Sequence, residues 1–228
     1  MKEILKFLND LSLNNDKKWF TEHKEEYLEA KARFETLTEK LILGISEFDH
    51  TSANLTVKDC TYRIYRDVRF SADKSPYKTH FGAYICPGGK KSGYAGYYFH
   101  IGTGKGENYP HSHMLAVGDY IYDPKALKII REDIMNGDGD FDSIIKNDIS
   151  KKFSFDEEFI LKKVPKGFPA DSPYSYYLRM KALCLSYTPD TKFMLDKNVV
   201  EKSVDLFKTT YPFTQYINRA IKYSKEEL

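Results

Sequence analysis

The spacing of apolar residues changes from a helical period to a strand period near residue 49, and this change limits the possible folds more than any other feature. Over residues 17–48 the apolar side chains recur at steps of three and four, as they do along one face of a helix. This spacing predicts one helix of about 30 residues, roughly 45 Å long, after a short amphipathic helix over 2–12. Its bulky apolar positions favour packing across a sheet over a coiled coil.

The region that follows has the composition of strands and tight turns. Residues 61–101 are rich in Tyr, Phe, Ile and Gly, which favour strands and the turns between them. We expect strands near 61–70, 80–87 and 94–101, and a fourth strand near 114–121. Stretches rich in Ser, Pro and Gly separate them, as turns between antiparallel strands require.

The remainder of the chain is predicted to be mainly helical. Helices are expected near 124–136, 141–147, 173–185, 197–209 and 212–223, with a strand near 158–164. No repeat or low-complexity linker divides the sequence. We therefore predict a single α+β domain over 1–228, with a mainly antiparallel sheet, a long N-terminal helix and a helical C-terminal half.

Charge and cysteine content exclude several classes of protein. The chain has 35 Lys and Arg against 33 Asp and Glu, a net charge of +2, so nucleic acid and anionic membranes are not expected partners of the whole surface. Protein partners stay open. The three cysteines are widely spaced, and no run of about 18 apolar residues occurs. We expect a soluble cytoplasmic protein without a disulfide framework, a zinc knuckle or a membrane span.

The most distinctive feature is a cluster of arginines. Three of the seven arginines, Arg63, Arg66 and Arg69, fall within seven residues, although lysine is the usual cation elsewhere. A guanidinium group can bind a carboxylate or phosphate through two parallel hydrogen bonds, which lysine cannot do. On the predicted strand, Arg63, Asp67 and Arg69 share one face. Arg66 would face the other way unless a bulge turned it.

More cations follow the turn after these arginines, and a returning strand would bring a histidine alongside them. Residues 63–80 contain five Lys and Arg against two Asp, so the excess cations should face water or meet an anion. The candidate ligand-binding residues are Arg63, Arg66, Asp67, Arg69, Lys74 and Lys78. The catalytic candidates are His80 and Tyr77. Nearby cations favour the neutral form of His80.

Two interpretations of this stretch stay open. In the first, the arginines bind an anionic ligand such as a phosphorylated molecule, and no reaction can be assigned. In the second, the protein is a non-enzymatic interaction module in which Asp67 and Asp73 pair with the arginines as a structural hub. Guanidinium groups open to solvent favour the first interpretation, and groups capped by carboxylates favour the second.

Three other histidines are candidate metal ligands. His111 and His113 have strand spacing, and together with His100 they offer three imidazoles, a donor set that zinc accepts. They lie in or beside a polar loop without a His-Glu-x-x-His motif. This pattern does not predict a metal site, no cofactor is predicted, and whether these three histidines bind a metal stays open.

Residues 63–81 resemble the signature of domain of unknown function 2461, a widespread family of conserved hypothetical proteins. The resemblance continues over 95–100, 161–171 and 178–181. It implies a single α+β domain with the Arg-Asp-Arg stretch as its hallmark, and it implies no activity. Residues 115–124 depart from the family pattern, because one glycine stands where family members have a glycine-rich stretch.

Overall fold

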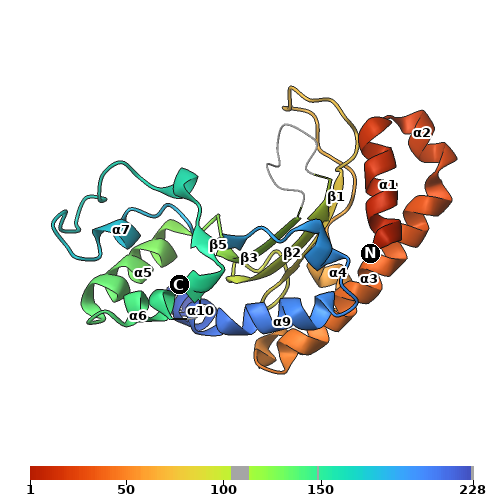
Figure 1. The fold of residues 1–228 in the computed structure, drawn as a ribbon. Coiled ribbons are helices and arrows are strands. Elements are labelled where there is room, and N and C mark those ends of the chain that lie inside the picture. Colours follow the sequence, from red (N-terminus) through yellow and green to blue (C-terminus); the bar gives the residue numbers. More distant parts are fainter. Residues whose placement is uncertain (104–112, 148, 227–228) are drawn as a thin grey trace.

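A five-stranded antiparallel sheet forms the centre of the structure, a computed structural model that describes residues 1–103, 113–147 and 149–226 (Figure 1). In spatial order the strands are β1 (His80–Ile85), β2 (Gly96–Gly102), β3 (His113–Asp119), β5 (Leu183–Tyr187) and β4 (Ser154–Phe155). Each neighbouring pair is antiparallel. The predicted α+β class, with a mainly antiparallel sheet and helices on either side of it in sequence, is confirmed.

The N-terminal helices are α1 (Lys2–Leu13), α2 (Lys17–Glu22) and α3 (Lys24–Ser46). The Asp16 side chain caps α2 by accepting hydrogen bonds from two backbone N–H groups at its start. The prediction of one continuous helix over 17–48 is wrong at His23. The His23 ring stacks on Trp19 and its Nδ1 lies 2.8 Å from the Trp19 carbonyl oxygen, which occupies that carbonyl at the end of α2.

The remaining helices are α4 (Val57–Cys60), α5 (Pro124–Asn136), α6 (Asp140–Lys146), α7 (Ser175–Leu178), α8 (Thr191–Met194), α9 (Val199–Thr209) and α10 (Tyr211–Glu226). Short 3₁₀ turns lie at His50–Ser52, Ile149–Lys151 and Glu157–Phe159. Within the described ranges, no helix combines the length and the apolar character needed to cross a membrane.

Two predictions for the C-terminal half are wrong. The strand expected near 158–164 is a 3₁₀ turn followed by irregular chain, in which a single bridge joins Ile160 to Met180. The helix expected over 173–185 is limited to α7, because the residues after it pair with β3 as β5. Strand pairing across the sheet outweighs the local helical pattern here.

The two faces of the sheet have different surroundings. Phe81 of β1 and Phe99 of β2 point to the face that packs against α3, where Phe34 stacks on Phe81 with 5.3 Å between ring centroids. Figure 1 shows α3, α9 and α10 along this side, with the chain between α4 and β1 and the segment that carries α7 rising on the other. Strand alternation places His80 and His100 on that second face.

Candidate functional site

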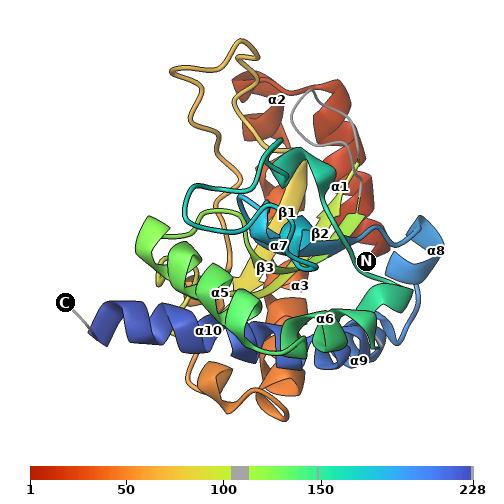
Figure 2. The ribbon, with the colours of Figure 1, turned by 90° about the vertical axis from the view of Figure 1, so that its left-hand side faces the viewer.

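Residues 61–79, called the 61–79 hairpin below, form an irregular extension beside β1 and α2 (Figure 2). Two backbone hydrogen bonds join its arms, from the N–H of Arg66 to Pro76 and from the N–H of Lys78 to Ile64. The predicted strand over 61–70 is therefore wrong. Proline has no N–H to donate, and the polar turn between the arms bonds to itself, so no regular ladder forms.

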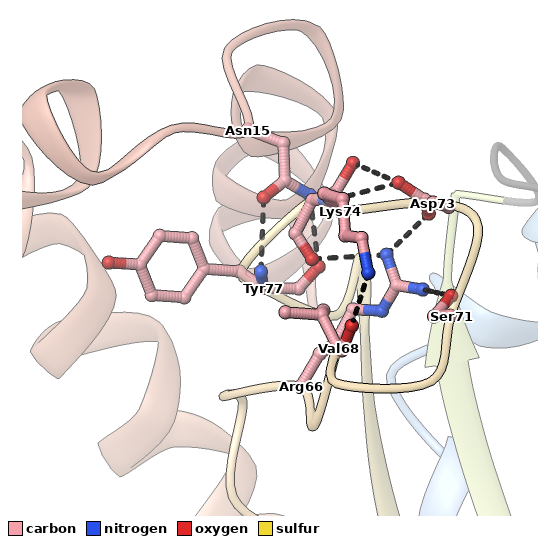
Figure 3. Close-up of polar contacts among 8 residues, drawn as sticks. Asn15, Arg66, Val68, Ser71, Asp73, Lys74 and Tyr77 are labelled. Carbon is pink, nitrogen blue, oxygen red and sulfur yellow. Dashed lines mark hydrogen bonds and ion pairs between the residues drawn. The ribbon is translucent and has the colours of Figure 1, made fainter.

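Tyr77 fixes the 61–79 hairpin to the N-terminal helices. The side-chain amide of Asn15 donates to the Tyr77 carbonyl at 2.9 Å and accepts from its N–H at 3.1 Å (Figure 3). The buried Tyr77 ring stacks on Phe20 at 3.9 Å between centroids. This position makes Tyr77 a packing residue and gives no support to a catalytic role.

Arg66 lies inside the turn of the hairpin, with its side chain only 16% exposed. Its guanidinium donates to the Asp73 carboxylate, to the Ser75 carbonyl at 3.1 Å and to the Ser71 hydroxyl at 3.4 Å (Figure 3). Hydrogen bonds from Ser75 and then from Arg66 lower the pKa of Asp73 to about 2. Arg66 therefore holds the turn together, as in the structural interpretation of the arginine cluster.

Arg69, Asp67 and Lys74 lie at the exposed tip. The Arg69 guanidinium binds the Asp67 carboxylate through Nε at 2.9 Å and Nη2 at 2.7 Å, while its side chain remains 76% exposed. These bonds lower the pKa of Asp67 to about 2. The Lys74 ammonium donates to the Val68 carbonyl. Each of these charged groups at the tip is thus bonded locally, and Arg66 and Arg69 bind different carboxylates.

This difference between Arg66 and Arg69 gives a stability prediction. We expect Arg66→Ala to lower the free energy of unfolding by about 1–2 kcal/mol, because it leaves a partly buried carboxylate without its cation. Arg69→Ala should leave the free energy of unfolding nearly unchanged, because exposed ion pairs contribute little to stability. Urea denaturation of both variants measures this. Equal losses in the two variants would show that Arg66 has no special structural role.

A second group of cations and rings lies at the base of the hairpin, on the face of the sheet away from α3. Lys78 lies with its ammonium 5.5 Å from the centre of the Tyr62 ring. The His80 and His100 rings stack at 4.4 Å, and the Tyr98 hydroxyl lies 3.0 Å from Nδ1 of His100. The Lys78 cluster comprises Tyr62, Arg63, Lys78, His80, Tyr98 and His100.

The electrostatics of the Lys78 cluster are unusual. Burial and the neighbouring charge of Arg63 lower the pKa of Lys78. Burial and then the charges of Lys78 and Arg66 lower the pKa of His80 to about 3, so its imidazole is neutral at pH 7. In the part of the chain that the structure describes, no carboxylate lies within ion-pair distance of Arg63 or Lys78. The charge of Arg63 also helps to lower the pKa of Asp67, but among the described residues neither Arg63 nor Lys78 forms an ion pair with a carboxylate.

The sequence interpretation placed Arg63, Lys78 and His80 in the candidate site but did not name Tyr62 or Tyr98 there, nor the stacking of His100 on His80. Alternation along two antiparallel strands was the available signal, because Gly82 pairs with His100 and Tyr84 with Tyr98. Gly82 also leaves space for the side chain of Tyr98. A Cβ there would lie 2.5 Å from the Tyr98 hydroxyl.

The candidate metal ligands His100 and His113 do not come together in the part of the chain that the structure describes. His100 pairs with Met114 and Ile101 pairs with His113, so the two imidazoles point to opposite faces of the sheet. His111 lies outside the described residues. Over the described ranges, no group of three or more His, Cys, Asp or Glu side chains is arranged to hold a metal ion.

A cavity of about 910 Å³ lies at the far end of β1 and β2 from Lys78. Its lining includes Pro87 and Tyr94 from the β1–β2 connection, and Tyr216 and Arg219 from α10. None of the candidate residues named from the sequence lines it. The cavity and the Lys78 cluster are separate features of the fold.

Comparison with known proteins agrees with the resemblance found in the sequence. No curated protein and no solved structure matches the chain. One family model, described as conserved hypothetical protein (DUF2461), matches residues 3–216, which is nearly the whole chain and includes all of the Lys78 cluster. The chain therefore belongs to this family of conserved hypothetical proteins.

Proposed function

We propose that this protein binds a small anionic ligand at the Lys78 cluster. The observation that supports the proposal is the position of Lys78, a partly buried ammonium group beside a second cation, Arg63, with no carboxylate of the described residues at ion-pair distance from either. Like charges repel, and removal of water strengthens that repulsion. A bound phosphate or carboxylate would neutralise both groups and raise the pKa of Lys78.

The other members of the cluster suit an anion as well. The neutral imidazole of His80 and the hydroxyl of Tyr98 bring N–H and O–H groups to the cluster without adding charge. Hydrogen bonds from such donors orient an anion whose charge is matched by Arg63 and Lys78. We propose binding alone and assign no reaction to the site.

The proposed site differs from the set named from the sequence. Arg63, Lys78 and His80 are retained. Arg66 and Arg69 are excluded because carboxylates within the 61–79 hairpin already bind them, and Lys74 because it bonds to a backbone carbonyl. A substitution of Arg69 is therefore the natural control, since it removes one positive charge from the same hairpin without touching the proposed site.

A thermal-shift screen tests the proposal with phosphate, sulfate, dicarboxylates and sugar phosphates as probes. A ligand at 100 times its Kd adds about 2.7 kcal/mol of stability, which raises the Tm by roughly 5–10 °C in a domain of this size. We expect one class of anion to raise the Tm of the wild type and of Arg69→Gln, and to leave that of Lys78→Met unchanged. Equal shifts in all three proteins, or no shift with any probe, would contradict the proposal.

Without ligand, Lys78→Met is expected to be at least as stable as the wild type. The lowered pKa of Lys78 means that the folded protein disfavours its charge. Methionine keeps most of the apolar stem and can contact the Tyr62 ring through its sulfur. Urea denaturation at pH 7 in an anion-poor buffer gives the comparison. A marked loss of stability would assign Lys78 a structural role instead.

A further inference from the structure

The cavity of about 910 Å³ has a volume typical of a site for a small molecule. Its walls come from the turn that carries Thr51, the β1–β2 connection, α6 and α10, and Figure 2 shows α6 beside α10. The side-chain amide of Asn218 on α10 bonds to both the N–H and the carbonyl of Ala95, at 2.8 and 2.9 Å. The Tyr216 ring packs on Phe141 of α6 with 5.1 Å between centroids. These contacts make the cavity a fixed part of the fold.

Polar side chains that line the cavity are available for hydrogen bonds to a ligand. In the described part of the chain, the side chains of Asp140, Ser143 and Gln215 form no hydrogen bond with other residues. The Thr51 hydroxyl donates to the buried carboxylate of Asp49 at 2.5 Å, so its oxygen remains able to accept. The cavity therefore presents hydrogen-bond acceptors and donors together.

The two cations that line the cavity each lie near a carboxylate but form no hydrogen bond with it. Nη2 of Arg219 lies 3.8 Å from Asp133, and Nζ of Lys222 lies 3.6 Å from Glu226. The Arg219 guanidinium also lies 5.2 Å from the centre of the Tyr216 ring. Both ion-pair distances exceed the length of a hydrogen bond, so the N–H donors remain available. Since each cation has a carboxylate nearby, the cavity suits a neutral ligand better than an anion.

We propose that this cavity binds a neutral saccharide. Sugar hydroxyls donate and accept hydrogen bonds, which matches the acceptors Asp140 and Thr51 and the donors Arg219 and Gln215. Hydrogen bonds to charged groups such as Asp140 and Arg219 are the strongest of these. The C–H groups of a sugar ring can pack on the apolar part of the lining, such as Ile144. This site is separate from the Lys78 cluster and takes a different class of ligand.

Calorimetry with the full chain tests the proposal with glucose, maltotriose, cellotriose and triacetylchitotriose as probes. We expect saturable binding of at least one trisaccharide. Asp140→Asn should weaken that binding about tenfold, because it replaces a charged acceptor with a neutral amide. Asp138→Asn is the matched control, since Asp138 is exposed and does not line the cavity. Its φ of 48° is one that asparagine tolerates, and the affinity should stay within about threefold of the wild type.

A second variant tests the position of the bound sugar. Ser143 lies on α6, lines the cavity and is exposed, so Ser143→Tyr should fold normally while its ring occupies part of the space. We expect it to abolish binding of the same saccharide. The proposal is overturned if no probe binds, if binding survives unchanged in Asp140→Asn and Ser143→Tyr, or if Asp138→Asn weakens it as much as Asp140→Asn. None of these outcomes bears on the Lys78 cluster, whose probes are anions.

Discussion

Gly118→Ala is expected to lower the free energy of unfolding by about 3–5 kcal/mol, a large fraction of the stability of a typical domain. Gly118 has a φ of +105°, a conformation that residues with a Cβ rarely adopt. A Cβ there would lie 2.0 Å from the Leu183 carbonyl oxygen, which is backbone of β5 and cannot move aside cheaply. The substitution therefore strains the β3–β5 pairing, which holds the C-terminal part of the sheet in place.

Gly93→Ala is the matched control for this prediction. Gly93 also has a positive φ, +75°, but no atom lies within 4 Å of the position that its Cβ would take. Gly93→Ala should therefore lower the free energy of unfolding only through the strained backbone conformation, by about 1 kcal/mol. Urea denaturation of both variants gives the two values. Similar losses would show that the contact with β5 is relieved easily and that the register there tolerates a side chain.

The second large effect is a change of stability with pH that arises from the protonation of His80. Its folded-state pKa of about 3 lies well below the value of about 6.5 that an unfolded chain gives. Between these values the unfolded state binds a proton that the folded state does not, so stability falls as the pH falls through this window. From pH 7 to pH 5 the expected loss is about 2 kcal/mol.

His80→Gln should lack this loss, because glutamine cannot take up the proton in the unfolded state. Denaturation curves at several pH values test this, in a buffer without phosphate or dicarboxylates. Above pH 7 the curves of the two proteins should run parallel, which gives an internal control for any change in overall stability. If they also run parallel from pH 7 to pH 5, then burial and the charges of Lys78 and Arg66 do not hold His80 neutral.

Local patterns predict the parts of this fold whose stabilising contacts lie near in sequence. The strands expected over 80–87 and 94–101 agree closely with β1 and β2, because alternating residues and a glycine-rich turn define a hairpin within about twenty residues. The amphipathic spacing of α9 and α10 is local in the same way. The β5 segment was expected as helix because its partner, β3, lies about seventy residues earlier in the chain.

The candidate site shows the same limit. Counting charges shows that the 61–79 hairpin has more Lys and Arg than Asp, but the count does not show which of these cations pair with a carboxylate. Arg66 finds Asp73 only because the turn folds back on itself, and Arg69 takes Asp67 two residues away. Alternation along the two strands indicates which residues share a face, but the stacking of His80 on His100 also depends on the exact register of β1 against β2, which alternation alone does not specify.

Histidine NMR tests the central claim, that an anion binds at the Lys78 cluster, most directly. Imidazole resonances would be followed while inorganic phosphate, or the anion with the largest thermal shift, is added to saturation. The account predicts that the resonances of His80 and His100 move, while those of His23 and His50, which lie on other segments, stay in place. Saturable binding by calorimetry with no change at His80 and His100 would place the anion elsewhere and contradict the account.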